Sequence, residues 1–173
     1  LAPEKGLPVA FHAISLLVRA GADVSLAIFG KGAAAYEAHL RSIVARLGLQ
    51  ERVIFLGNHQ DWQAYASDAD ALVFPSLGEG TSNVVLESLA IGLPVIISDI
   101  AMTRQMLRDG VNAVIVTDSG KQSWKDAIWK TISDPDFRDK IRAAGRKIAD
   151  QYSIAEMVSR HEELYQEVAG AGK

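Results

Sequence analysis

The chain has 173 residues, 49% of them hydrophobic, which is enough apolar material for the core of one domain. Its 18 basic and 21 acidic residues give a net charge of -3, without the clustered basic excess that is typical of nucleic-acid binding. Cysteine is absent, which excludes disulfides and thiolate metal sites, and the apolar runs are far shorter than the roughly 20 residues of a membrane-spanning helix.

Short runs rich in β-forming residues alternate with helical patterns along the first two thirds of the chain. The predicted strands are residues 24–29, 53–56, 71–75, 94–98 and 113–116. The predicted helices between them are residues 9–20, 33–47, 62–67, 82–91 and 103–107. Apolar strands separated by helices are typical of a parallel sheet that is buried on both faces. The sequence therefore predicts an α/β fold with a doubly wound, Rossmann-like parallel sheet.

Three further helices are expected after the last strand, at residues 122–132, 136–150 and 154–168. Asp134-Pro135 separates the first two and is interpreted as a helix stop followed by a helix start. We expect these C-terminal helices to wrap back over the domain. The domain then occupies residues 1–169, and residues 170–173 form a loose tail.

The loop after the third predicted strand is the most informative one, because open parallel sheets bind ligands outside the carboxyl ends of their strands. Residues 75–83 leave a buried strand, cross a loop that contains glycine and enter a helix near Ser82. A helix N-terminus offers free N–H groups and a partial positive charge to a phosphate. Glu87 follows about one helical turn after Asn83, where it could accept hydrogen bonds from ribose or sugar hydroxyls. The residues alone predict a site for a phosphate-containing ligand.

Residues 79–87 and 90–96 also form a motif, in which Glu79 and Glu87 are followed by an A-x-G-x-P-V-I run. This segment resembles the E-x7-E signature of family 4 glycosyltransferases, which are retaining enzymes with the GT-B fold. Similarity of the same kind extends in order to residues 5–6, 29–32, 52–57, 70–76 and 109–113. The resemblance covers nearly the whole chain and implies the C-terminal, nucleotide-sugar-binding half of such an enzyme.

The resemblance also implies roles for individual residues. Glu79 would sit beside the donor sugar at the reacting anomeric carbon, and Glu87 would hold the ribose hydroxyls. Lys5 would neutralise the departing diphosphate, which gains charge as the glycosidic bond breaks. Backbone amides would face the sugar and the diphosphate, and two loops would lie near the nucleotide; the residues concerned are Gly80, Thr81, Ser82, Asn83, Gly57, Asn58 and Gly30. Gly30 and Gly32 fit a tight turn as well as a phosphate contact.

The chain departs from the family pattern at two places. The usual Gly-Arg-Leu stretch at the end of the first strand is represented only by Leu1, so an arginine phosphate clamp and a central strand are missing. Without that strand we expect two unpaired inner sheet edges, unless another segment fills the same place. Thr81-Ser82-Asn83 replaces the commoner Phe-Gly-Leu, which puts polar side chains beside the donor sugar and leaves the sugar's identity open.

Other candidate motifs have simpler interpretations. Asp68-Ala69-Asp70 matches the D-x-D metal motif, but it precedes a strand and is interpreted as a helix-to-strand turn. His59 is the one histidine expected near the cleft. Trp62, Trp124 and Trp129 are expected to be core or seam residues rather than sugar platforms. No metal and no cofactor are expected.

The sequence thus predicts a cytoplasmic hexosyltransferase domain that uses UDP-, GDP- or similar nucleotide sugars in glycan, polysaccharide or glycolipid synthesis. Its partner would be an N-terminal acceptor domain of the same polypeptide, which could attach to the inner membrane and bring a lipid-linked or glycan acceptor. The isolated chain should then be inactive. A sugar-nucleotide epimerase, a phosphorylase of the same plan and a non-catalytic binding module remain as alternatives. The nucleotide, sugar, acceptor, pathway and oligomeric state stay open.

Overall fold

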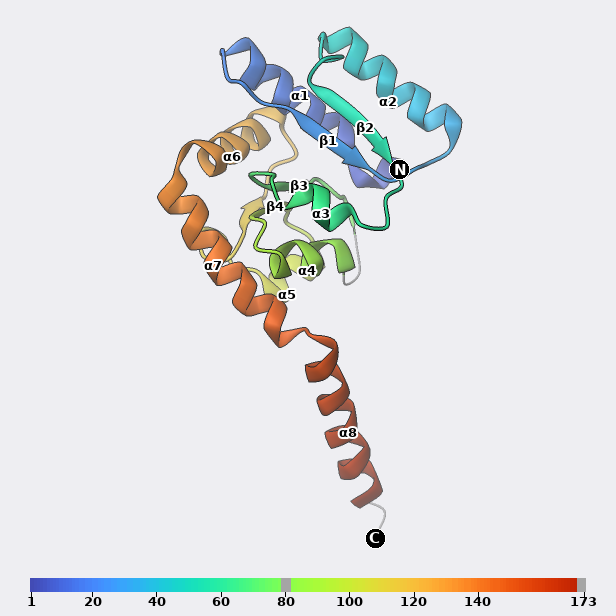
Figure 1. Ribbon diagram of the computed structural model, residues 1–173, viewed down its shortest axis with the longest axis vertical. Coiled ribbons are helices and arrows are strands. Elements are labelled where there is room, and N and C mark those ends of the chain that lie inside the picture. Colours follow the sequence, from blue (N-terminus) through green and yellow to red (C-terminus); the bar gives the residue numbers. More distant parts are fainter. Residues whose placement is uncertain (79–81, 171–173) are drawn as a thin grey trace.

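A computed structural model of the chain describes residues 1–78 and 82–170 (Figure 1). Its strands are β1 (Leu26–Phe29), β2 (Val53–Gly57), β3 (Leu72–Phe74), β4 (Val95–Ser98) and β5 (Val114–Val116). Its α-helices are α1 (Leu7–Arg19), α2 (Ala34–Leu47), α3 (Trp62–Ala66), α4 (Asn83–Ala90), α5 (Ala101–Met106), α6 (Lys121–Ser133), α7 (Pro135–Gln151) and α8 (Ile154–Gly170). These bounds lie within about two residues of those that the sequence pattern predicts.

The strands form two parallel sheets that are not joined to each other in the described part of the chain. β1 pairs with β2, and β3, β4 and β5 pair in that order. The two sheets therefore leave β1 and β3 unpaired with each other, and both are edge strands. The chain enters between these edges, because the backbone amine of Leu1 bonds to the carbonyl of Lys31, just after β1.

Helices cover both faces of the larger sheet, and each face has its own apolar core. Ile96 and Val114 belong to the core shared with α1 and α6. Val95 and Ile97 belong to the core shared with α4 and α5. Successive side chains of a strand point to opposite faces, so one strand supplies both cores. This arrangement confirms the doubly wound α/β fold.

Two of the three C-terminal helices pack as expected. Asp134 caps α7 by accepting a hydrogen bond from the Phe137 amide at 3.0 Å, so Asp134-Pro135 is the predicted helix boundary. α7 lies against the sheet side that carries α4, and Ile141 and Gly145 are buried there. The expected return of the last helix is wrong, because α8 extends away from the rest of the molecule (Figure 1) and its described side chains are largely exposed.

The predicted loose tail, residues 170–173, is described only at its first residue. Gly170 belongs to α8, which continues the helical pattern beyond residue 168, while residues 171–173 lie outside the described part of the chain. Among the described residues no helix combines the length and the apolar character needed to cross a lipid bilayer.

Candidate functional site

The loop after β3 is fastened at its start to the first residues of the chain. The amide of Leu77 donates a hydrogen bond to the carbonyl of Glu4 at 2.8 Å, and the hydroxyl of Ser76 donates to the same oxygen at 3.2 Å. Lys5 follows Glu4 at the end of a short 3-10 helix, Pro3–Lys5. The backbone thus holds Lys5 beside the first residues of the predicted phosphate loop, although the two are about 70 residues apart in sequence.

A glycine makes this close approach possible. Gly6 has a φ of 64°, in the left-handed region, and a Cβ at this position would overlap the carbonyl oxygen of Pro75. Any other residue would therefore push the N-terminal segment off the end of β3. The ammonium of Lys5 lies 6.0 Å from the centre of the Phe74 ring, which is at the end of β3. Lys5 is thereby positioned at the carboxyl end of the sheet.

The helix that follows the loop begins where the sequence predicts it. Ser82 is the N-cap of α4, with an extended backbone at φ -95° and ψ 112°, and it is buried. Asn83 is the first helical residue and is exposed. Hydrogen bonds within the helix start with the amide of Val85, which donates to the carbonyl of Ser82 at 3.1 Å, so the amides of Asn83 and Val84 precede them, and the helix dipole adds a partial positive charge there. The start of α4 can therefore bind an anion. Three predicted site residues, Glu79, Gly80 and Thr81, lie outside the described residues.

Glu87 is held in place by two residues of α3. Its Oε2 accepts hydrogen bonds from the indole Nε1 of Trp62 at 3.0 Å and from the side-chain amide of Gln63 at 2.9 Å. A carboxylate has about four acceptor positions, so these two bonds fix its orientation and leave others for a ligand. Glu87 is half-buried on α4, one turn after its start. The sequence did not reveal the contacts of Trp62 and Gln63 with this candidate site residue, since Trp62 was interpreted as a core or seam residue.

The loops after β1 and β2 meet at two glycines. The amide of Gly30 donates to the carbonyl of Gly57 at 2.6 Å, and both residues have positive φ, 104° and 76°. This backbone conformation favours glycine, so both positions are explained by the turn itself. Asn58 follows and is exposed. Gly30, Gly57 and Asn58 therefore lie together at the carboxyl ends of β1 and β2.

An aromatic cluster joins these loops to Glu87. The ring of Phe29 lies 6.2 Å from Trp62, 6.3 Å from Tyr65 and 6.3 Å from His59. His59 and Tyr65 are 4.9 Å apart, and Tyr65 is 58% exposed. Trp62 thus contacts Phe29, which ends β1, and also bonds to the carboxylate of Glu87. The structure brings Glu87 and the β1 and β2 loops into one region.

Asp68 and Asp70 do not belong to this region. They lie in the turn between α3 and β3, at the opposite end of the sheet, as the sequence predicts. Asp70 forms an ion pair with Arg138 of α7, with the guanidinium nitrogen 2.7 Å from the carboxylate. In the described part of the chain, no cluster of His, Cys, Asp and Glu side chains is grouped as metal ligands would be.

A family model described as glycosyl transferases group 1 matches residues 1–134 of the chain. The matched region includes the start of α4, Glu87 and the N-terminal segment with Lys5. The chain belongs to the glycosyl transferases group 1 family. It is thus a transferase domain, with the α/β fold of the C-terminal half of GT-B enzymes.

Relatives and solved structures agree with this placement. The chain is 31% identical over 173 residues to a phosphatidyl-myo-inositol mannosyltransferase of Mycobacterium leprae, a match that covers 98% of the chain and 45% of that protein. It is 28% identical over 141 residues to the putative glycosyltransferase EpsD of Bacillus subtilis, with 82% and 37% covered. The chain therefore spans less than half the length of these relatives.

The fold of this group 1 domain is also that of several solved structures. One is HepE of Anabaena in complex with UDP and glucose, with a TM-score of 0.85 at 23% identity; the match covers 98% of the chain and 46% of that protein. A second is sucrose-phosphate synthase of Thermosynechococcus elongatus, with a TM-score of 0.87 at 21% identity and coverage of 98% and 44%. At this identity the likeness shows the fold.

Proposed function

We propose that this group 1 domain binds the nucleotide-sugar donor of a retaining hexosyltransferase. Two findings support the donor: the family itself, and the fold shared with a protein that was solved with UDP and glucose. Since the chain spans 45% of its mannosyltransferase relative, the activity belongs to a longer protein. The other part of that protein would be an N-terminal domain that binds a glycan or lipid-linked acceptor.

The observation that carries this proposal is the fixed carboxylate of Glu87. Two hydrogen bonds from α3 hold its Oε2, so the remaining acceptor positions keep a constant direction. A ribose presents two neighbouring hydroxyls, which match a carboxylate in this setting. The aromatic cluster around Phe29 lies on the adjoining side, where the base of the same nucleotide would be placed.

The diphosphate would lie between the start of α4 and Lys5. The first-turn amides that follow Ser82 offer N–H groups, and the ammonium of Lys5 adds a full positive charge at the end of β3. Negative charge grows on the leaving diphosphate as the sugar departs, so fixed positive groups favour the transition state more than the ground state. By its place in the family motif, Glu79 would lie beside the anomeric carbon of the donor sugar. Transfer would need no metal ion, and treatment with a chelator should leave the rate unchanged.

Nucleotide binding by the full-length protein tests the role of Glu87. Glu87→Ala should weaken the binding of UDP or GDP at least about tenfold in calorimetry, because a hydrogen bond to a charged group contributes about 1.5–3 kcal/mol. Trp62→Phe, which removes the indole donor and part of the ring but keeps the carboxylate, should weaken it less. Glu163→Ala, on exposed α8, is the matched control and should bind as the wild type does. Titrations of Glu87→Ala that cannot be told from the wild type would remove the ribose role.

The transfer reaction needs its own measurement. Glu79→Ala in the full-length protein should reduce sugar transfer sharply while nucleotide binding stays, and the product should keep the anomeric configuration of the donor by NMR. The 173-residue chain alone should bind nucleotide weakly and show no turnover, because the acceptor domain is not part of it. Inversion at the anomeric carbon, or a product that is an epimer of the donor, would contradict the proposal.

The unpaired edges of β1 and β3 lead to one structural expectation for the whole protein. Leu1 bonds to Lys31 after β1, and Glu4 bonds to Leu77 after β3, so the chain crosses between the two sheets at their carboxyl ends. A strand that leads into Leu1 would fill the space between the edges and run parallel to both. Amides of β1 and β3 should accordingly exchange with solvent more slowly in the full-length protein than in this chain.

A further inference from the structure

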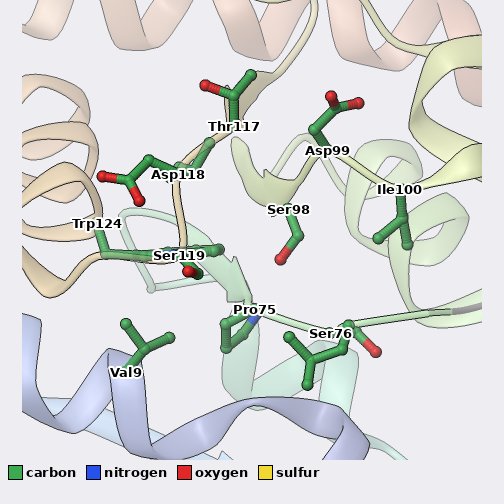
Figure 2. Close-up of a pocket in the computed structure, with 12 residues that line it drawn as sticks. Val9, Pro75, Ser76, Ser98, Asp99, Ile100, Thr117, Asp118, Ser119 and Trp124 are labelled. Atoms are coloured by element: carbon green, nitrogen blue, oxygen red, sulfur yellow. The ribbon is translucent and has the colours of Figure 1, made fainter.

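A separate cavity of about 160 Å³ opens at the carboxyl ends of β3, β4 and β5 (Figure 2). It is lined by residues that follow these strands and by the sides of α1 and α6. Val9 and Pro75 lie on one side of it in Figure 2, and Asp99 and Thr117 lie on the opposite side. Engineered cavities of about 150 Å³ hold one benzene molecule, so this space admits a single six-membered ring.

The cavity lies on the other side of the sheet from Glu87. Val116 and Trp124, which line it, belong to the apolar core between the sheet and the helices α1 and α6. Ser98 lies two residues after Ile96 on β4, so it faces the same side. Glu87 projects from α4, which packs on the opposite side. A group in the cavity would not compete with a ribose at Glu87.

Three hydroxyl groups at the cavity lack hydrogen-bond partners within the described part of the chain. They belong to Ser98 at the end of β4, and to Thr117 and Ser119 in the loop after β5. Ser98 is half-buried, and Figure 2 shows its side chain directed toward the middle of the lining residues. Each hydroxyl can donate one bond and accept two. Together they form a polar rim above the apolar floor of Val9 and Trp124.

The charged groups at the rim are both acidic. Asp118 accepts hydrogen bonds from the Gly120 amide at 2.9 Å and from the Ser123 hydroxyl at 2.9 Å, and the first of these is the main cause of its lowered pKa. The pKa of Asp99 is lowered mainly by its hydrogen bond from Arg104. Among the described lining residues there is no lysine or arginine. Asp118 therefore offers carboxylate acceptor positions at the rim to an uncharged group that donates hydrogen bonds.

The geometry points to a subsite for an uncharged, hydroxylated six-membered ring, which would be the end of an acceptor whose remaining part is bound by the N-terminal domain. Such a ring has apolar C–H faces for the floor and hydroxyls for the rim of Ser98, Thr117 and Ser119. Pro75 and Ser76 line the cavity and also begin the loop that leads to the proposed donor site, so the two sites adjoin. The acceptor identity rests on the proposed function, whereas binding of the ring does not.

Ring binding is measured on the full-length protein by saturation-transfer NMR, with D-glucose, D-mannose and myo-inositol as probes. At least one probe should bind, with a dissociation constant in the millimolar range. Ser98→Val keeps the shape of a strand residue but removes the hydroxyl, and Ser119→Leu fills the mouth of the cavity; each should weaken the binding at least about fivefold. Ser42→Leu places the same added bulk on the exposed side of α2 and should bind as the wild type does.

Nucleotide titrations on the same variants separate this subsite from the donor site. Ser98→Val and Ser119→Leu should keep the wild-type affinity for UDP or GDP, and Glu87→Ala should keep the ring affinity. The ring should also bind in the presence of saturating UDP or GDP, since the acceptor and the donor occupy different places. The subsite is overturned if no probe binds, if both cavity variants bind the ring unchanged, or if Glu87→Ala or the nucleotide abolishes ring binding.

Discussion

α7 and α8 are helices of equal length, 17 residues each, and they behave in opposite ways. α7 lies against the sheet domain and buries Ile141 and Gly145. α8 extends away, and its apolar residues Met157, Leu164 and Tyr165 are at least half exposed. Both sequences have amphipathic spacing, so the pattern is not what separates them. Amphipathic spacing thus specifies a helix, whereas the position of that helix depends on a surface that fits it.

Hydrogen exchange gives the largest difference between the two helices. Amides of α7 should exchange only through global unfolding, which costs about 5–15 kcal/mol in a domain of this kind. An isolated helix of this length is marginal in water. The amides of α8 should therefore exchange at rates within about a few powers of ten of those of an unstructured peptide. Equal protection of both helices in the 173-residue chain, measured by mass spectrometry, would contradict the exposed position of α8.

A core deletion in α7 should have the next largest effect. Ile141 is fully buried, so Ile141→Ala should lower the free energy of unfolding by about 2–5 kcal/mol in urea titrations. Leu164→Ala makes a similar truncation in α8, where the side chain is 52% exposed, and should change it by no more than about 0.5 kcal/mol. The comparison fails if the two variants are destabilised equally.

Sequence patterns predicted the elements well and the contacts between them poorly, for the same reason. The strands and α4 are marked by local residue choices, so the helix start near Ser82 and the position of Glu87 on α4 were predicted correctly. The bond between Trp62 and Glu87 joins residues 25 positions apart, and it exists only because the fold brings the start of α3 within reach of α4. No local signal distinguishes an indole that orients a carboxylate from one that fills a core.

The course of α8 illustrates the same limit. The spacing of its apolar residues predicted the helix and its length. Its expected return to the domain required an apolar surface on the sheet domain that no other helix covers. α7 already covers α4, with Gly145 seated against Leu89. The break between β1 and β3, in contrast, could be predicted from sequence order alone, because it follows from strand adjacency and not from side-chain fit.

A smaller effect is expected from adding bulk where α7 meets α4. A Cβ on Gly145 would lie 2.8 Å from the side chain of Leu89 and 3.3 Å from the carbonyl of Asn112. Gly145→Val should therefore destabilise the domain by about 1–3 kcal/mol, although valine is a better helix former than glycine. Ala143→Val, on the exposed side of α7, is the control and should cost about 0.5 kcal/mol. If thermal melts show that Ala143→Val is less stable than Gly145→Val, α7 does not pack closely against α4.

The ion pairs of the two helices should give the smallest difference. Arg138 of α7 lies 2.7 Å from Asp70 in the turn before β3, so this pair ties the helix to the body. Arg160 of α8 lies 3.0 Å from Glu156, four residues earlier in the same helix. Both pairs are partly exposed, and pairs of this kind contribute about 0–1 kcal/mol.

Where each pair is anchored decides which measurement detects its loss. Arg138→Gln should lower the free energy of global unfolding by up to about 1 kcal/mol, and high salt should reduce this loss because it screens the pair in the wild type. The pair of Arg160 lies wholly within α8, so unfolding of the sheet domain does not depend on it. Arg160→Gln should therefore destabilise only the helix α8, by about 0.3–0.5 kcal/mol, which is measured as a loss of helicity. A loss of body stability in Arg160→Gln would mean that α8 is coupled to the sheet domain after all, and the contrast with α7 would then be one of degree.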